Sequence, residues 1–250
     1  MKEHEFKFTP SVVLLPLYLV LFLWIVFWIE QQFKISFSNY GIYPRTFSGL
    51  KGILFSPFLH GDLGHLFNNS LALLFLLASL RFFYRDNSFQ VLFYGILLSG
   101  IGTWLIGRES YHIGASGLVY VLASFIFFKG IQTRYYRLVA LSFTIILLYG
   151  GMIWYIFPNA ETHISWESHL SGFLVGLLFS WLYSSPLYQK PMIYDWQKPD
   201  YDSSKDPFMK HFDGKGNFIS SSKMRELELE KWNYFVSNLP VIYNYKKKED

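Results

Sequence analysis

The feature that most constrains this chain is a series of six stretches that carry no charged residue and are long enough to cross a lipid bilayer. A bilayer core needs about 17–25 mainly apolar residues in a helix, which satisfies its own backbone hydrogen bonds in lipid. The first 185 residues hold only 19 charged side chains, too few to cover a large soluble domain. We therefore predict an all-α membrane protein with six transmembrane helices, over Phe8–Ile29, Leu63–Leu80, Asn87–Gly107, Ser110–Phe128, Leu138–Ala160 and Ser168–Gln189.

Charge divides the chain into two parts. Residues 186–250 hold 21 charged side chains among 65 residues, together with several Pro and Ser residues. We expect a membrane domain over residues 1–185 and a polar cytoplasmic tail over 186–250, partly flexible, with a short helix near 222–236. The tail has 11 Lys and Arg against 10 Asp and Glu, which does not support a nucleic-acid partner. The chain has no cysteine and no paired metal-ligand motif, so no metal or cofactor is expected.

The distribution of Lys and Arg in the connecting segments predicts the orientation in the membrane. Without the tail, 7 of these cations lie on the side shared by both termini and 4 on the other side. Both termini are therefore predicted to be cytoplasmic, and the short loops favour a bacterial inner membrane. In this orientation the second, fourth and sixth helices all begin at the outer face.

Polar residues gather where these three helices begin. Polar groups inside a membrane are costly, so each is a candidate functional residue. The residues concerned are His60, His65 and Asn69, then Gly114, Ser116 and Gly117, then His169, Gly172 and Gly176. Ser116 is six residues into its stretch, which is about 9 Å at 1.5 Å per residue. We expect the three segments to place a serine, two histidines and an asparagine at one level below the outer surface.

These residue types suit nucleophilic catalysis. Glycines on the fourth and sixth helices allow a close approach, which would bring the Ser116 hydroxyl to the His169 imidazole. The histidine can take the hydroxyl proton during attack and return it to the leaving group. His65, Asn69 and the backbone N–H of Ser116 are suitable donors for the oxyanion of a tetrahedral intermediate.

Other polar residues receive supporting or structural roles. Tyr120, one turn below Ser116 on the same face, is expected to pack against the imidazole. Glu167 lies on a different helix face from His169 and is not assigned a role in orienting it. His60 is expected to form a structural hydrogen bond to the preceding loop, and His112 and His163 to be solvated in outer loops.

The three motifs together resemble the rhomboid family of intramembrane serine proteases, over about residues 50–185. The motifs are His60-x4-His65-x3-Asn69, Gly114-x-Ser116-Gly117 and His169-x2-Gly172-x3-Gly176. The resemblance implies a rhomboid-like bundle with Ser116 as nucleophile, His169 as general base and acid, His65 and Asn69 at the oxyanion site, and Tyr120 supporting the His169 ring. It also implies cleavage of transmembrane protein substrates near their outer ends, at small residues, with the fifth helix and the following loop forming the lateral entry.

One difference from the family concerns the first loop. The family often carries Trp-Arg eight or nine residues before the first motif histidine, where this chain has Lys51-Gly52. The difference leaves open how the loop is anchored, while the residues of the proposed chemistry are unaffected.

Two alternatives remain at this stage. A non-catalytic rhomboid-like protein that binds membrane clients predicts loss of the serine or the histidine, and both are present. A metal-dependent membrane hydrolase or transporter would use His60, His65, His163 and His169 with Glu or Asp from the outer loops. His60 and His65, however, are five residues apart and do not form the i, i+4 pair of a helical zinc site. The protease hypothesis names transmembrane substrates and membrane lipids as partners.

Overall fold

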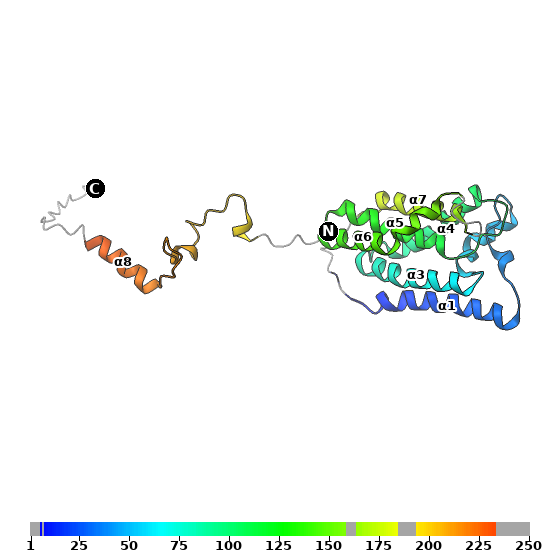
Figure 1. Ribbon diagram of the computed structural model, residues 1–250, viewed down its shortest axis with the longest axis horizontal. Helices are drawn as coiled ribbons and strands as arrows, with labels where there is room; N and C mark the ends of the chain where they lie inside the picture. The colour runs from blue at the N-terminus through cyan, green and yellow to red at the C-terminus, as the bar shows by residue number, and fades with distance from the viewer. Residues whose placement is uncertain (1–5, 7, 159–163, 185–193, 234–250) are drawn as a thin grey trace, which may run out of the picture. The chain divides into compact units, whose positions relative to one another are not determined.

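The computed structural model describes residues 6, 8–158, 164–184 and 194–233, and the chain divides into two units, Met1–Lys190 and Pro191–Asp250. The first unit is a bundle of long helices (Figure 1). Its long helices are α1 (Ser11–Phe33), α3 (Leu63–Phe83), α4 (Ser88–Ile106), α5 (Ser116–Thr133), α6 (Tyr136–Tyr149) and α7 (Trp166–Leu182). Short elements occupy the connections: η1 (Ser38–Tyr40), η2 (Ser48–Lys51), α2 (Gly52–Phe55), η3 (Ser56–Phe58) and η4 (Gly150–Ile156).

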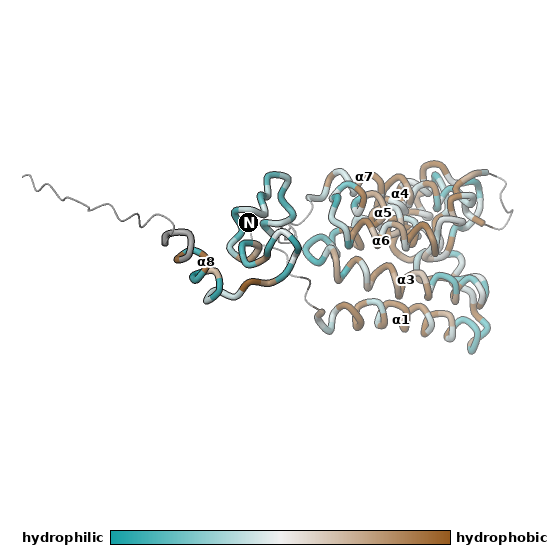
Figure 2. The backbone as a smooth tube through the Cα atoms, turned by 60° about the vertical axis from the view of Figure 1, so that its left-hand side comes forward, coloured by the Kyte–Doolittle hydropathy of each residue, from teal (hydrophilic) through white to brown (hydrophobic). Residues whose placement is uncertain are grey.

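The apolar helices confirm the predicted all-α membrane bundle, whereas the number of six spans stays a prediction. Among the described residues, five helices are long and apolar enough to cross a bilayer: α1, α3, α4, α5, and α6 together with η4. The sixth predicted stretch forms α7, which has 17 residues and is slightly shorter than each of the other five spans. In Figure 2 the tube of these helices is mainly hydrophobic in colour.

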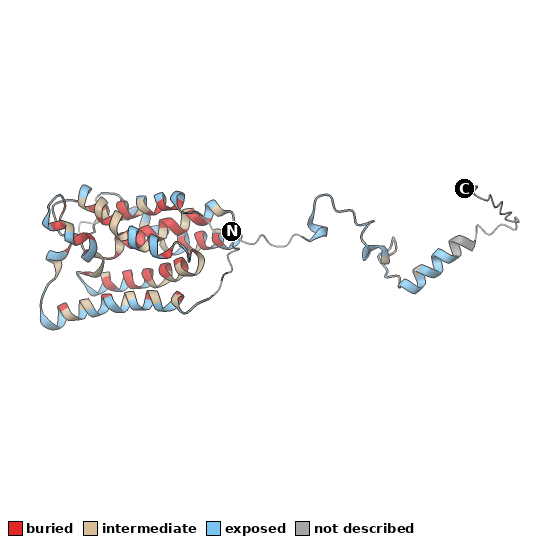
Figure 3. Cartoon of the chain, turned by 180° about the vertical axis from the view of Figure 1, so that it is seen from behind, coloured by how far each residue is buried: buried red, intermediate tan, exposed pale blue. Residues whose placement is uncertain are grey.

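Helix α5 lies at the centre of the bundle. It packs against α3, α4, α6 and α7, while α1 packs on α3. In the most apolar window of α5, 61% of the residues are buried, against 22% in α1, so α1 presents most of its surface to the surroundings. Figure 3 shows the buried residues concentrated in the inner helices. The core is built mainly from leucines of α3 and from aliphatic and aromatic residues of α5, with Phe125 and Leu73 fully buried.

The fourth predicted stretch differs from the helix that forms. It was expected to begin at Ser110, but α5 begins at Ser116 because the preceding residues form a loop. In this loop the backbone of His112 exchanges two hydrogen bonds with Ile42, at 3.0 and 2.8 Å, and Gly114 has a φ of +112°. At the other end, the helix was expected to end at Phe128, but α5 continues to Thr133 and includes Lys129, which is buried and donates a hydrogen bond to the Ser180 carbonyl at 3.0 Å.

The second unit contains η5 (Asp195–Gln197), η6 (Met209–His211) and α8 (Ser221–Asn233). Helix α8 begins one residue before the helix predicted over 222–236, and residues 234–236 of that prediction lie outside the described residues. Its described side chains are mostly exposed.

Candidate active site

The loop before α5 determines where Ser116 lies. Ser116 is the first residue of α5, and Gly114 precedes it in the left-handed backbone region that favours glycine. A Cβ at Gly114 would lie 2.5 Å from the Cε1 atom of His65, so a side chain here would displace that ring. The Gly114 N–H donates to the Ser56 carbonyl at 2.9 Å. Glycine is therefore required at this position, and it allows His65 to pack beside the segment that carries Ser116.

His65 and Asn69 lie on successive turns of α3. The Asp62 side chain caps this helix by accepting a hydrogen bond from the His65 N–H at 2.8 Å, which fixes the first turn. Asn69 is buried, and its Nδ2 atom has no hydrogen-bond partner among the described residues. A buried amide donor without a partner is costly. Asn69 therefore offers a donor that a ligand or reaction intermediate can use.

His60 contacts His65 rather than forming the predicted hydrogen bond to the preceding loop. The two rings meet edge to face with centroids 5.0 Å apart. His60 is buried, and within the described part of the chain neither ring nitrogen has a partner in hydrogen-bond geometry. Burial, and secondarily the nearby His65, lower the pKa of His60. The nearby Phe58 backbone raises the pKa of the ring, but less than burial lowers it. His60 is thus a neutral ring that supports His65 by packing.

The His169 imidazole is held on two sides. It lies in the first turn of α7, is 7% exposed, and its Nδ1 is 3.1 Å from the Tyr155 carbonyl. Because a carbonyl can only accept, we assign the ring proton to Nδ1, which leaves the Nε2 lone pair free. The Tyr120 ring stacks on the imidazole at 4.3 Å and 17°, and its hydroxyl donates to the Met152 carbonyl at 2.6 Å. The predicted packing of Tyr120 against the ring is therefore observed.

Helices α5 and α7 touch through their backbones next to Ser116 and His169. A Cβ at Gly172 would lie 2.2 Å from the Gly117 carbonyl oxygen and 3.0 Å from the Tyr120 Cβ. A Cβ at Gly117 would lie 2.7 Å from the Ser168 Oγ. Gly172 is therefore needed for this approach because it meets backbone, whereas a side chain at Gly117 would have to displace the Ser168 hydroxyl. The chain neighbours of Ser116 and His169 meet, but no hydrogen bond joins Ser116 to His169 in the described residues.

One turn deeper, the same contact is repeated. A Cβ at Gly176 would lie 2.2 Å from the Val121 carbonyl oxygen and 2.0 Å from the Ser124 Oγ. Gly172 and Gly176 therefore form one continuous face along which α7 lies directly on α5. The G-x-x-x-G spacing correctly predicted this close helix contact.

An apolar cavity of about 330 Å³ lies between α5, α6, η4 and α7. Tyr120 and Ser124 form part of its wall on α5, and Phe173 contributes from α7. The two hydroxyl groups on the α5 side are already used, since Tyr120 donates to Met152 and Ser124 donates to the Tyr120 carbonyl at 2.8 Å. Tyr120 thus belongs both to the cavity wall and to the stack on His169.

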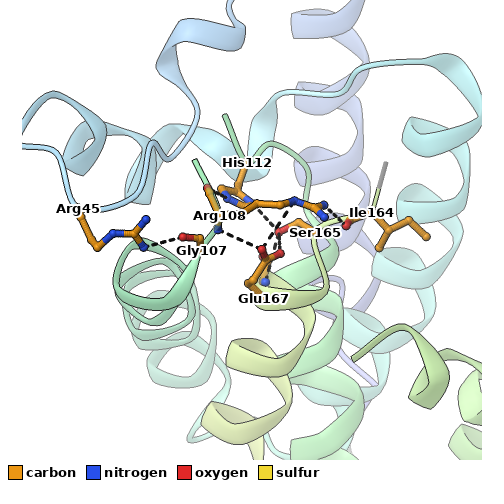
Figure 4. A network of polar contacts seen from close by, with 8 residues as sticks. Arg45, Gly107, Arg108, His112, Ile164, Ser165 and Glu167 are labelled. Atoms are coloured by element: carbon orange, nitrogen blue, oxygen red, sulfur yellow. Dashed lines mark hydrogen bonds and ion pairs between the residues drawn. The ribbon is translucent and has the colours of Figure 1, made fainter. Parts of the chain in front are cut away.

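Sequence reasoning missed a buried polar network at the start of α7 (Figure 4). Glu167 is 1% exposed and accepts a hydrogen bond from the Arg108 backbone N–H at 3.1 Å, while the Arg108 Nε is 3.7 Å from the same carboxylate oxygen. The Arg108 guanidinium also donates to the Ile164 carbonyl. The one signal in the sequence was an acidic residue beside an otherwise uncharged stretch, and its partner lies 59 positions earlier.

His112 belongs to this network, so its predicted solvation is wrong. The side chain is 4% exposed, with Nε2 at 3.0 Å from the Arg108 carbonyl and Nδ1 at 2.6 Å from the Ser165 Oγ. Burial lowers the pKa of His112, so the ring is neutral and donates through Nε2. Ser165 in turn caps α7 by accepting from the Ser168 N–H at 3.3 Å. His163, the other histidine expected to be solvated, lies outside the described residues.

The long first loop is anchored by residues other than Lys51 and Gly52. Arg45 donates from Nη1 to the Gly107 carbonyl at 2.6 Å, and its N–H donates to the Trp104 carbonyl at 3.1 Å. The Trp104 indole donates back to the Thr46 carbonyl at 2.9 Å. A cation on the last carbonyls of α4 also suits the negative end of the helix dipole.

The packing of the first loop requires glycine at position 52. A Cβ there would lie 2.2 Å from the Gly41 carbonyl carbon and oxygen, so the backbone of the first loop crosses itself at this point. The Lys51 ammonium lies 4.5 Å from the centre of the Tyr40 ring, in cation–π geometry. Lys51-Gly52 is thus part of a different loop packing, in which an arginine and a tryptophan from other positions fix the loop to α4.

No group of three or more His, Asp or Glu side chains arranged to hold a metal ion is found among the described residues. The histidines that come together, His60 and His65, contact through their rings. His169 is held by a carbonyl and a tyrosine instead.

Comparison with known families matches residues 48–186 to the model of the Rhomboid domain. Uncharacterized proteins of Mycobacterium tuberculosis and Mycobacterium bovis are 32% identical to this chain over 181 residues, covering 67% of this chain and 73% of each relative. An uncharacterized protein of Mycobacterium leprae is 30% identical over 177 residues, covering 66% of this chain and 68% of the relative.

Proposed function

Because the chain belongs to the rhomboid family of intramembrane proteases, we propose that it is a serine endopeptidase with Ser116 as nucleophile and His169 as general base and acid. The observation that carries this proposal is the fixed His169 ring, with Nδ1 on the Tyr155 carbonyl and one face on Tyr120, at the point where α7 touches α5 beside Ser116. The Nε2 lone pair is then available to a hydroxyl. In proteases without bound substrate, such a hydrogen bond is often long and tightens only in the complex.

The reaction follows from these groups. As Ser116 Oγ attacks the scissile carbonyl carbon, its proton passes to His169 Nε2 and the carbonyl oxygen becomes an oxyanion. His169 then gives this proton to the leaving amine as the C–N bond breaks, which leaves an acyl ester on Ser116. A water attacks the ester, its proton passes to Nε2 and on to the Ser116 oxygen, and the second product leaves as a carboxylic acid.

The oxyanion needs donors in a site of low dielectric. The unpartnered Nδ2 of Asn69 supports its assignment to this role, together with the His65 ring and the backbone N–H of Ser116. A single such donor typically contributes about 2.7–4 kcal/mol to the transition state. Asn69 is the donor most easily tested, because its Nδ2 has no hydrogen-bond partner to lose among the described residues.

The substrates we propose are transmembrane proteins, cut near their outer ends at small side chains. The protein is an integral membrane protein. We propose a bacterial inner membrane with both termini in the cytoplasm, as the Lys and Arg distribution indicates. The relatives in mycobacteria support a bacterial setting. Residues 186–250 are proposed to form a cytoplasmic tail outside the catalytic bundle.

The test uses purified full-length protein in vesicles with a model transmembrane substrate. Wild-type protein should cut the substrate and react with a fluorophosphonate, and Ser116→Ala and His169→Ala should each abolish both activities. Ser124→Ala is the matched control, because this serine lies on the same helix and its hydroxyl donates to the backbone carbonyls of Tyr120 and Val121. Binding of the substrate without cutting would favour the non-catalytic alternative. Loss of cutting in EDTA, with Ser116→Ala still active, would favour a metal-dependent enzyme.

A further inference from the structure

The buried carboxylate of Glu167 is not used by the proposed chemistry. We infer that Glu167 is a positioning residue, which fixes the first turn of α7, and with it His169, against the loop that leads to Ser116. This inference rests on the proposed function, because it concerns the alignment of the same serine and histidine.

The burial of Glu167 requires an explanation. A carboxylate that is 1% exposed loses its hydration, which is costly unless it is paired and hydrogen-bonded. Glu167 finds both kinds of partner in one residue, since the Arg108 N–H donates at 3.1 Å and the Arg108 guanidinium lies 3.7 Å away. Arg108 is partly exposed, so the ion pair has one end in a polar environment.

A second set of hydrogen bonds joins the start of α7 to the loop that contains Arg108. The Arg108 carbonyl accepts from His112 Nε2, and His112 Nδ1 accepts from the Ser165 hydroxyl, which caps α7. Both polar groups of the Arg108 backbone are therefore used to hold the start of α7, the N–H by Glu167 and the carbonyl through His112 and Ser165 (Figure 4).

The position of this network explains what it can control. Glu167 is two residues before His169, and Arg108 and His112 lie in the loop that ends at Ser116. The contact between Gly117 and Gly172 sets the distance between the helices. The two sets of polar contacts at the start of α7 add a constraint on the rotation of its first turn about the helix axis. A misplacement of about 1 Å at a reacting group can cost about 10²-fold in rate.

The experiment separates the reach of the carboxylate from its charge. Glu167→Gln keeps the shape and one acceptor oxygen for the Arg108 N–H but loses the charge. Glu167→Asp keeps the charge but withdraws the carboxylate by one methylene. Glu109→Ala is the matched control, because Glu109 is the exposed carboxylate next to Arg108. For each variant we would measure kcat and KM on a transmembrane substrate, the rate of fluorophosphonate labelling, and thermal unfolding.

A positioning role predicts that both kcat and the labelling rate decrease in the order wild type, Glu167→Gln, Glu167→Asp. Glu167→Asp should lose about tenfold or more, with KM within about twofold of wild type, and Glu109→Ala should match wild type. Glu167→Asp with higher kcat than Glu167→Gln would overturn the inference, as would a loss confined to KM or one that only parallels the loss of thermal stability. Wild-type protein without Ser116-dependent cutting would instead refute the proposed function, and this inference with it. Active wild-type protein with unchanged Glu167 variants would refute the inference alone.

Discussion

The contact between α5 and α7 allows a quantitative prediction at Gly172. In Gly172→Ala the new methyl group would lie 2.2 Å from the Gly117 carbonyl oxygen, whereas ordinary contacts begin at 3.4 Å. The helices must therefore separate locally by about 1.2 Å, because the atom that is met belongs to the backbone and cannot rotate away. The displacement would act on the proposed pair of Ser116 and His169, since Gly172 follows His169 by three residues.

Two energies compete in this substitution. Alanine is more favourable than glycine inside a helix by about 1 kcal/mol. Overpacking a close contact typically costs about 1–3 kcal/mol, so we expect a net loss of stability of up to about 2 kcal/mol. The reactivity of Ser116 should fall much further, by about 10²-fold, because misplacement of a reacting group by about 1 Å has that effect.

The assay compares three glycine variants in the same vesicles. Fluorophosphonate labelling reports on Ser116, and thermal unfolding reports on the fold. Gly151→Ala is the matched control, because its Cβ would meet nothing within 4 Å. Gly176→Ala meets the Val121 carbonyl oxygen at 2.2 Å, one turn further from the site, and should lose stability with a smaller loss of labelling. If Gly172→Ala labels as fast as wild type, or Gly176→Ala loses as much labelling, the close contact does not control the alignment.

Three further predictions follow from single contacts. Asn69→Ala should lower kcat by about 10²–10³-fold without loss of thermal stability, because the Nδ2 it removes has no partner in the described residues. Equal losses of kcat and of thermal stability would instead give Asn69 a structural role. Gly52→Ala should lower the unfolding temperature, because the new Cβ would meet the Gly41 backbone and such overpacking costs about 1–3 kcal/mol. Gly61→Ala is the control and should leave the unfolding temperature unchanged, because the nearest atom would be 3.9 Å from its Cβ. Burial lowers the pKa of His112 in the folded protein from its ordinary value of 6.5. Below pH 6.5 the His112 ring of the unfolded chain therefore binds a proton more readily than that of the folded protein, and the free energy of unfolding should fall as the pH drops. Thermal unfolding between pH 8 and 5 should show a smaller fall in His112→Gln, and an identical fall would contradict the assignment.

The sequence predicts those parts of the molecule that depend on local rules. Charged side chains are excluded from lipid, so uncharged stretches locate the membrane helices without knowledge of their partners. His65 and Asn69 are four residues apart and fall on one face of α3 as expected. The spacing of Gly172 and Gly176, together with Gly114 and Gly117 on the fourth predicted helix, likewise predicts a close contact between the fourth and sixth helices.

The errors occur where distant segments decide the local structure. α5 begins at Ser116 rather than Ser110 because the loop before it pairs with Ile42, more than sixty residues earlier. His112 is buried by the same pairing and by Ser165, which no local pattern could indicate. Lys129 is buried inside α5, where the Ser180 carbonyl of α7 accepts the hydrogen bond of its ammonium. In each case the deciding partner is far away along the chain.

The first loop carries this argument one step further. A motif-based expectation would treat Lys51-Gly52 as the loss of an anchor, yet the loop is fixed to the end of α4 by Arg45 and Trp104. These two side chains provide a guanidinium on helix carbonyls and an indole N–H on a loop carbonyl. The anchored loop pairs with His112 through Ile42, and His112 bonds to Ser165 at the start of α7. The loop is therefore in contact with the segment before Ser116 through Ile42, and the residues that fix it to α4 are Arg45 and Trp104 rather than Lys51 and Gly52.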